Sequence, residues 1–261
     1  MRKLLFTIVL FLSLLVSAVA QYSSLNAHSH NDYEQGTPFF MAYNAHFGSI
    51  EADIWAVDGK LFVAHDKSDI KPGITLDSLY IQPIVRLFRN NGRKAWNDHP
   101  STFQLMIDLK TEVEPTLPLL VELLKKYPDV FNPKQNKNVV RIVITGNRPE
   151  PSDFRNYPDF VFFDGNVNRK YDDQQLQRIA LFSENLRSFT SWNGKGFIPQ
   201  NEEKRLRQVI DSVHGLTKKI RFWNAPDTDV AWKILMNLKA DYINTDHIQE
   251  LANYLKTNKN E

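Results

Sequence analysis

The 261-residue sequence contains no cysteine, and this absence removes several classes of protein. Disulfide scaffolds, thiolate zinc sites, cysteine nucleophiles and a lipid-modified N-terminal cysteine all need a thiol. The charge has no dominant sign, with 32 Lys and Arg against 30 Asp and Glu, so no large basic field points to nucleic acid as a partner. The overall composition is that of a globular protein and argues against collagen, a coiled coil or a disordered tail.

The first twenty residues have the pattern of a secretory signal peptide. A positive start at Arg2 and Lys3 precedes an apolar run over residues 4–16, and residues 18–20 offer the small-x-small pattern that signal peptidase reads. The apolar run is too short for a spanning helix, although an uncleaved membrane anchor is the alternative. We therefore expect cleavage before Gln21 and export to the periplasm or the exterior, with no stable membrane insertion afterwards.

Residues 21–261 are predicted to form one domain, because no Gly/Ser-rich or Pro-rich linker divides them. Short β-branched runs alternate with segments of helical spacing. The strand-like runs are a segment just before His28 and residues 49–55, 103–109, 139–145, 160–163, 179–183, 219–223 and 241–244. The helix-like segments are 38–47, 75–90, 116–127, 172–178, 202–213, 229–238 and 248–255. This order predicts an α/β fold, a single (β/α)8 TIM barrel with a small β-hairpin after strand 2, with an open doubly wound sheet as the alternative.

Polar residues near the strand ends are informative, because a barrel of this kind carries its chemistry at the carboxyl ends of its strands. Side chains alternate along a strand, so Glu51, Asp53 and Trp55 share one face while the apolar residues between them share the other. Asp108 and Lys110 repeat the arrangement on another strand. Salt-bridged surface carboxylates are the alternative for one such pair alone.

Three carboxylates in one cavity repel one another unless a cation lies among them. A set made only of oxygen ligands favours a hard ion, Mg²⁺ or Ca²⁺, over zinc. We therefore predict that Glu51, Asp53 and Asp108 hold one divalent metal ion.

Two histidines are predicted to lie at the same barrel mouth. His28 follows the first strand, and a tight turn at residues 57–60 leads through a hairpin strand to His65. Two histidines beside a divalent ion form an acid–base pair in which one removes a proton and the other delivers one. We therefore predict His28 and His65 as catalytic, without deciding which is the base. His30 remains open as a supporting or substrate-binding residue.

These motifs, taken in order, resemble the PLC-like phosphodiesterase superfamily. Its most similar branches are the glycerophosphodiester phosphodiesterases, the spider-venom-type sphingomyelinases D and the altered-inheritance-of-mitochondria protein family. The motifs are His28 with Asn31, similar to H-x-x-N; Ile50-Glu51-Ala52-Asp53, similar to IE-x-D; His65-Asp66; Ile107-Asp108-Leu109-Lys110-Thr111, similar to D-L-K-T; Phe222-Trp223-Asn224; and the segment 241–246, similar to D-G-I-x-T-D.

The resemblance implies a barrel enzyme that cleaves a phosphodiester, with one ion held by the three carboxylates and with catalysis by two histidines. It also implies that Lys110 faces the substrate and that Trp223 lines the pocket. We expect Asn31, His30 and Trp55 to contribute to substrate binding. The chain has His28-Ser29-His30 where glycerophosphodiesterases carry H-R-G, so three substrates stay open: a glycerophosphodiester, a phospholipid headgroup or a lysophospholipid.

Two other functions remain open at this point. The pair His28-x-His30 also resembles the zinc-binding H-x-H of amidohydrolases, although Thr145, Phe163 and Ser183 stand where further histidine ligands are expected. A barrel that binds a ligand without turnover is the other alternative, because a fold does not establish a function.

Overall fold

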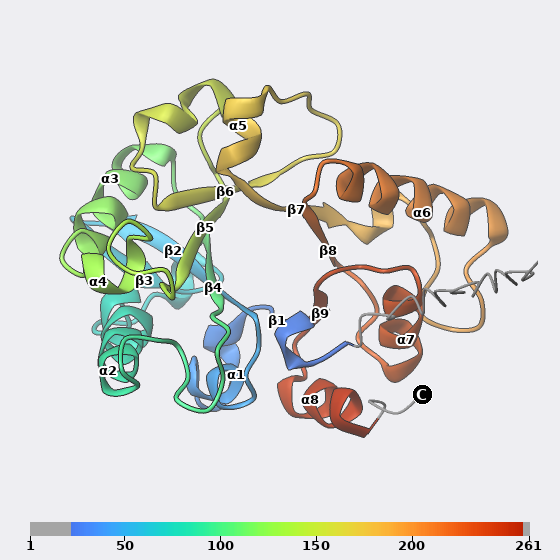
Figure 1. Ribbon diagram of the computed structural model, residues 1–261, viewed down its shortest axis with the longest axis horizontal. Helices are drawn as coiled ribbons and strands as arrows, with labels where there is room; N and C mark the ends of the chain where they lie inside the picture. Colours follow the sequence, from blue (N-terminus) through green and yellow to red (C-terminus); the bar gives the residue numbers. More distant parts are fainter. Residues whose placement is uncertain (1–21, 258–261) are drawn as a thin grey trace, which may run out of the picture.

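The computed structural model describes residues 22–257 of the chain as a ring of strands with helices around its outside (Figure 1). The predicted signal peptide, residues 1–20, lies outside the described residues. Neighbouring strands follow the order β8-β7-β6-β5-β4-β2-β1-β9, and all pairs along this path are parallel. The strands are β1 (Ala27–Ser29), β2 (Ser49–Val57), β4 (Gln104–Leu109), β5 (Arg141–Gly146), β6 (Val161–Gly165), β7 (Ile179–Asn185), β8 (Lys219–Trp223) and β9 (Ile243–Thr245).

The ring closes weakly between β8 and β9, through one isolated parallel bridge that joins Arg221 to Tyr242. Eight parallel strands in a nearly closed ring with helices outside confirm the predicted (β/α)8 barrel over the open sheet. The first strand differs from its prediction in one detail, because β1 contains His28 instead of ending before it.

The predicted hairpin is also present. Strand β3 (Lys60–Val63) pairs antiparallel with the end of β2 and lies off the barrel path. The two turn residues, Asp58 and Gly59, have φ values of 47° and 71°. Positive φ at both central positions is the geometry of the two-residue turns that suit the twist of a hairpin.

The helices connect the strands on the outside of the ring (Figure 1). They are α1 (Phe40–Asn44), α2 (Gln82–Asn90), α3 (Val113–Leu124), α4 (Pro128–Phe131), α5 (Asp173–Arg178), α6 (Gln200–Gly215), α7 (Asp229–Asn237) and α8 (Ile248–Thr257). Short turns η1 (Ser24–Asn26), η2 (Asp32–Glu34), η3 (Lys67–Asp69), η4 (Asp77–Ile81), η5 (Pro151–Asn156) and η6 (Leu186–Ser188) complete the connections. The region predicted as a helix at 38–47 forms only the short α1, and β5 connects to β6 through η5 without an α-helix.

Two apolar layers hold the barrel. The larger packs the outer faces of the strands against the helices and includes Ile50, Ile54 and Ile107, as strand alternation predicts. The smaller joins Met106, Val143, Leu181 and Tyr242. Met106 shares a strand face with Asp108, two residues nearer the amino end of β4. The smaller cluster therefore fills the barrel below the polar residues at its mouth, where side chains make a packed core.

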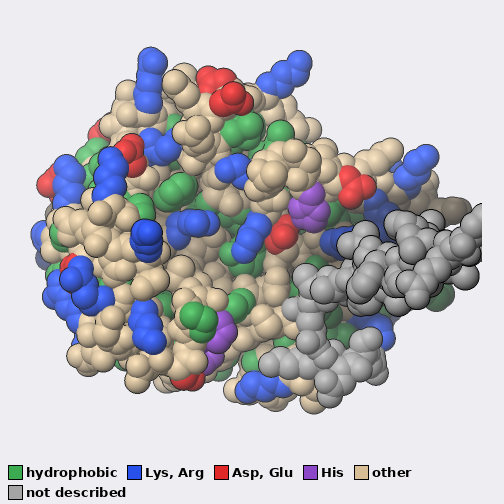
Figure 2. Space-filling model, in the orientation of Figure 1, with side chains coloured by type: hydrophobic (Ala, Val, Ile, Leu, Met, Phe, Trp, Pro, Cys, Tyr) green, Lys and Arg blue, Asp and Glu red, His purple; other side chains and the backbone are tan. Residues whose placement is uncertain are grey.

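The surface agrees with the balanced composition. Figure 2 shows Lys and Arg side chains distributed around one face of the molecule, with Asp and Glu among them. Within residues 22–257, no helix combines the length and the apolar character that crossing a bilayer requires.

Candidate active site

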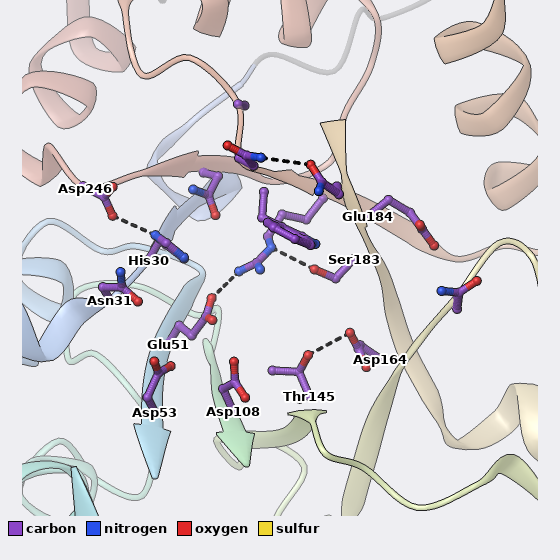
Figure 3. Close-up of a pocket in the computed structure, with 18 of the residues that line it drawn as sticks. His30, Asn31, Glu51, Asp53, Asp108, Thr145, Asp164, Ser183, Glu184 and Asp246 are labelled. Carbon is purple, nitrogen blue, oxygen red and sulfur yellow. Dashed lines mark hydrogen bonds and ion pairs between the residues drawn. The ribbon is translucent and has the colours of Figure 1, made fainter. Parts of the chain in front are cut away.

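A pocket of about 1010 Å³ opens at the carboxyl ends of the barrel strands. The strands contribute inward-facing side chains to it in ring order: Glu51 and Asp53 from β2, Asp108 from β4, Thr145 from β5, Asp164 from β6, Ser183 from β7, Arg221 from β8 and Asn244 from β9. Figure 3 labels six of these side chains, which converge on one space: Glu51, Asp53, Asp108, Thr145, Asp164 and Ser183. This is the end of a (β/α)8 barrel at which active sites are built.

The three predicted metal ligands come together in this pocket. Glu51, Asp53 and Asp108 each offer a carboxylate oxygen, and these atoms lie within 4.8 Å of one another. The β2–β4 register places Asp53 directly beside Asp108. Burial, and then the charges of Asp108 and Glu51, raise the pKa of Asp53 to about 6. A carboxylate pushed toward its neutral form by its neighbours is one that a cation would stabilise.

One atom in the group makes the fit to a cation more specific. Asp53 is almost fully buried, yet its Oδ1 has no hydrogen-bond partner. Buried polar atoms nearly always have a hydrogen-bond partner, so a buried oxygen without one indicates that a further group, such as an ion, binds there. The oxygen-only donor set of Glu51, Asp53 and Asp108 suits Mg²⁺ or Ca²⁺.

Lys110 joins two of these carboxylates. Its Nζ lies 2.9 Å from Asp53 Oδ2 and 2.9 Å from Asp108 Oδ2. Burial acts to lower the pKa of Lys110, but the charges of Asp108 and Asp53 outweigh it and raise that pKa. The lysine is therefore a positive charge held beside the carboxylates, on the inward face that strand alternation indicates, and its role toward the substrate stays a prediction.

Gly146, at the end of β5, leaves room for the side chain of Asp108 because it has no Cβ. A Cβ on Gly146 would lie 1.9 Å from Asp108 Oδ1, and its φ of +68° is one that residues with a side chain rarely adopt. Glycine at this position therefore leaves room for the third carboxylate. The sequence did not indicate this role, because the contact depends on the register between β4 and β5.

His28 lies beneath the pocket and does not line it. Its Nδ1 is 2.6 Å from Ser49 Oγ, its Nε2 is 2.6 Å from Glu51 Oε2, and the Arg221 guanidinium contacts both His28 and Glu51. Burial, and then the charge of Arg221, lower the pKa of His28 to about 3. The imidazole is therefore neutral, fully buried and engaged at both nitrogens.

Arg221 is the partner that keeps Glu51 ionised. Burial acts to raise the pKa of Glu51, but the charge of Arg221 and the hydrogen bond with His28 hold it well below its usual value. Sequence reasoning missed this arginine. A signal was present, since Arg221 is a charge in the middle of a predicted strand and shares a face with Trp223.

His30, in contrast, lines the pocket. Its Nδ1 lies 2.8 Å from Asp246 Oδ1, a pairing drawn in Figure 3. Burial acts to lower the pKa of His30, but the hydrogen bond with Asp246 and the charge of Glu51 outweigh it, so the pKa is raised. A carboxylate on Nδ1 fixes the ring and leaves Nε2 free for other partners.

His65 lies beside Asp53, with its side chain half exposed. Its Nδ1 is 3.4 Å from Asp53 Oδ2 and 3.2 Å from the hydroxyl of Tyr33. That hydroxyl donates to Asp53 Oδ2 at 2.7 Å and lies 3.0 Å from Asn31 Oδ1. Asn31 lines the pocket, and its contribution to substrate binding stays a prediction. Tyr33 was not predicted, since it lies in the short helix η2, and the left-handed backbone of Asn31 that directs this helix is not readable from the sequence.

The two predicted tryptophans differ. Trp223 lines the pocket and is 39% exposed. Trp55 does not line it, because β2 extends past the barrel rim there and Trp55 pairs with Phe62 of β3. Its indole N–H donates to the carbonyl of Ala64 at 3.0 Å. The structure therefore gives Trp55 a place in the hairpin and none in the pocket wall.

The site does not suit the zinc alternative. An H-x-H site needs both histidines free to bind the metal, but both ring nitrogens of His28 are engaged with Ser49 and Glu51. In the described part of the chain, the group of side chains able to hold a metal ion is the carboxylate set of Glu51, Asp53 and Asp108.

The chain is similar to known phosphodiesterase families. Residues 17–164 match the AIM6-like phosphodiesterase domain, and residues 219–249 match the glycerophosphoryl diester phosphodiesterase family. Altered inheritance of mitochondria protein 6 of Saccharomyces cerevisiae is 28% identical over 89% of this chain and 72% of its own length. The protein of the same name from Kluyveromyces lactis is 27% identical over 88% of this chain and 72% of its own length.

A solved structure shares the fold. The crystal structure of a glycerophosphodiester phosphodiesterase from Parabacteroides distasonis aligns with a TM-score of 0.51 at 16% sequence identity, covering 89% of this chain and 97% of that one.

Proposed function

The chain belongs to the family of AIM6-like phosphodiesterase domains, and from this premise we propose that it cleaves a small phosphodiester with one divalent ion and the histidine pair His30 and His65. Phosphoric diester hydrolysis is the chemistry of the family. The finer assignment rests on one observation: the carboxylate triad, His30 and His65 line the same pocket at the barrel mouth.

The positive groups of the site would bind the phosphate. Glu51, Asp53 and Asp108 would hold the Mg²⁺ or Ca²⁺ ion, which when bound supplies positive charge against the phosphate oxygens. Lys110, already fixed between Asp53 and Asp108, adds a second positive charge to the same oxygens.

His30 and His65 would transfer the protons. One imidazole removes the proton of the nucleophile, either a water or a neighbouring hydroxyl of the substrate, and the other protonates the leaving oxygen. Asp246 orients His30, and the Tyr33 hydroxyl lies beside Nδ1 of His65. We favour His30 over the sequence-based choice of His28, because a buried side chain engaged at both nitrogens does not reach a substrate.

The experiment that tests this function is ³¹P NMR of the protein with a mixture of glycerophosphodiesters, inositol phosphodiesters and lysophospholipids. We expect one diester signal to disappear with Mg²⁺ or Ca²⁺ and to persist with a chelator. A transient cyclic-phosphate signal would identify a substrate hydroxyl as the nucleophile. If every signal persisted with both metals, the proposal would be wrong and a barrel that only binds its ligand would replace it.

We also propose that the protein acts outside the cytoplasm, on the basis of the signal-peptide pattern in residues 1–20. Cell fractionation followed by N-terminal sequencing tests this proposal. A mature protein that begins at Gln21 outside the cytoplasm is expected, whereas an intact N-terminus in the cytoplasm would contradict it.

A further inference from the structure

The pocket continues well beyond the carboxylates and histidines. Its other side is made by the ends of β5, β6 and β7 and the loops that follow them, on the side of Asp164 and Glu184 in Figure 3. We define the far wall as six residues of this side: Arg148, Asp164, Asn166, Asn168, Glu184 and Asn185. The phosphodiester chemistry proposed above gives these residues no role.

The first feature of the far wall is that its groups are held in place. Glu184 is buried, and its Oε1 accepts a hydrogen bond of 2.7 Å from the backbone N–H of Val167. Asn166 Oδ1 accepts one of 2.8 Å from the N–H of Asn168, and the N–H of Asn166 donates to the Tyr171 hydroxyl at 2.8 Å. The loop after β6 is therefore fixed before any ligand binds, and such preorganisation lowers the entropic cost of binding.

The second feature is the mixture of donors and acceptors. Asp164 Oδ2 accepts a hydrogen bond from the Thr145 hydroxyl at 2.9 Å. The other carboxylate oxygen, Oδ1, forms an ion pair with Arg148 Nε at 2.8 Å but accepts no hydrogen bond. Three of the wall's side chains are amides, whose NH2 groups are donors; the Oδ1 atoms of Asn166 and Asn185 already accept hydrogen bonds within the protein. An alcohol hydroxyl also donates and accepts, so a cluster of hydroxyls matches this surface.

The third feature is what the pocket lining lacks among the described residues. Apart from the two histidines, Trp223 is its one aromatic side chain, so no aromatic cage surrounds a quaternary ammonium group. Its largest aliphatic side chain is that of Ala225, so no surface suits an acyl chain. The charge of Arg148 is paired with Asp164, and the carboxylate of Glu184 disfavours an anionic headgroup.

We propose that the far wall binds an uncharged, polyhydroxylated ring, and that the substrate is a diester in which such a sugar-like headgroup is esterified to the phosphate. This inference rests on the proposed phosphodiesterase function and names the substrate class for it. The ring hydroxyls bind the amides of Asn166 and Asn168 and the acceptors of Asp164 and Glu184. The exposed face of Trp223, at the pocket rim, is placed to pack against the apolar face of the ring.

The test compares three diesters that share the glycerophosphate half and differ only in headgroup: glucose, choline and ethanolamine. We expect kcat/KM for the glucose diester to exceed the other two by about tenfold or more, because a site built to bind hydroxyls discriminates against headgroups that lack them. Equal values for all three diesters, or a preference for choline or ethanolamine, would overturn the proposal while leaving the phosphodiesterase function intact.

Variants locate the preference on the far wall. Asn168→Ala removes an amide from an exposed side chain and leaves the fold at little risk, so the glucose-to-choline ratio of kcat/KM should fall several-fold. The control is Asn253→Ala, at an exposed position of α8 outside the pocket, which should leave that ratio unchanged. An unchanged ratio in Asn168→Ala, and likewise in Asn166→Ala, would place the headgroup elsewhere and overturn the proposal.

A binding measurement separates the two proposals if no diester is cleaved. Saturation-transfer NMR of the glucose diester with Ca²⁺ present reports contact with the ring protons without turnover. Ring contact that weakens in Asn168→Ala supports the far wall as a sugar-binding surface even if the phosphodiesterase function fails. The absence of ring contact in the unaltered protein would overturn it.

Discussion

The hydroxyl of Tyr33 lies 2.7 Å from Asp53 Oδ2 and 3.2 Å from His65 Nδ1, so one phenol joins a predicted metal ligand to a histidine of the proposed acid–base pair. Burial, and then the charge of Asp53, raise the pKa of Tyr33, which therefore stays protonated and donates to the carboxylate. A neutral donor in this position orients the ligand without adding charge to the site.

Tyr33→Phe should lower kcat by about 10- to 100-fold, since groups that orient metal ligands contribute on that scale. The affinity for Mg²⁺ or Ca²⁺ should fall as well, and KM should change less than kcat. Steady-state kinetics and a metal titration followed by thermal unfolding measure these effects. Tyr22→Phe is the control, because the Tyr22 hydroxyl donates to the carbonyl of Ala240 and does not line the pocket. Equal kinetic losses in both variants would assign Tyr33 a purely structural role.

Replacement of the two histidines of the H-x-H segment should affect different properties, activity for His30 and stability for His28. His30→Ala should lower kcat by about 10²- to 10⁴-fold with little change in thermal stability, because the side chain faces the pocket. His28→Ala should cost about 1–3 kcal/mol of stability, because Ser49 and Glu51 lose a buried partner. Kinetics and denaturant unfolding of both variants distinguish the roles. Full activity in His30→Ala would return the acid–base assignment to His28.

Gly146→Ala should weaken metal binding. The added methyl group would collide with Asp108 Oδ1, so the third carboxylate would be displaced. The alanine backbone would also have to adopt a positive φ, which residues with a side chain rarely do. We expect the rise in melting temperature on addition of Mg²⁺ or Ca²⁺ to shrink or disappear. Gly92→Ala is the matched control, because Gly92 has a similar φ of +69° and a Cβ there meets nothing within 4 Å. A full metal-induced rise in Gly146→Ala would show that Asp108 is not a ligand.

Asp164 should make stability depend on pH. Burial is the main cause that raises its pKa from 3.8 to about 7, against the opposing charge of Arg148. A carboxyl group whose pKa is higher in the folded than in the unfolded state contributes to the free energy of unfolding. This contribution is complete at pH values below the pKa of the unfolded state, which is near 4. This contribution, roughly 4 kcal/mol at most, is lost as the pH rises through about 7.

Asp164→Asn mimics the protonated acid and should remove this dependence. Urea unfolding of both proteins with chelator present, at pH 4, 5.5 and 7.5, gives the difference in the free energy of unfolding. That difference should shift in favour of the variant as the pH rises. A difference that stays constant over this range would mean that Asp164 is ionised throughout, held so by Arg148.

The sequence predicted the barrel and its carboxylates well for a simple reason. Alternation along a strand determines which side chains face inward, and it placed Glu51, Asp53, Asp108 and Lys110 on the inner face before any partner was known. The alternation of apolar residues on the outer face was confirmed in the same way by the core between strands and helices.

Depth inside the barrel was not predictable. His28 and His30 share a face, so alternation treats them alike, but the register pairs His28 with Ser49 and thereby places it below the level of Glu51. Trp55 shows the reverse error, because β2 continues above the rim to meet β3. The position of a side chain along the barrel axis depends on strand pairing, and a single strand carries no information about its partner.

The closure between β8 and β9 has a consequence for the newly made chain. Glu51, Asp53, Asp108 and both proposed acid–base histidines are synthesised before Arg221, while Asp246, which orients His30, comes later still. β1 obtains its second neighbour only when β9 arrives, and the β8–β9 seam is joined by the bridge from Arg221, the residue that keeps Glu51 ionised. A nascent or C-terminally truncated chain therefore contains the carboxylates and the two histidines, but it lacks the arginine that keeps Glu51 ionised and the aspartate that orients His30. We therefore expect hydrolysis to begin only after the barrel has closed.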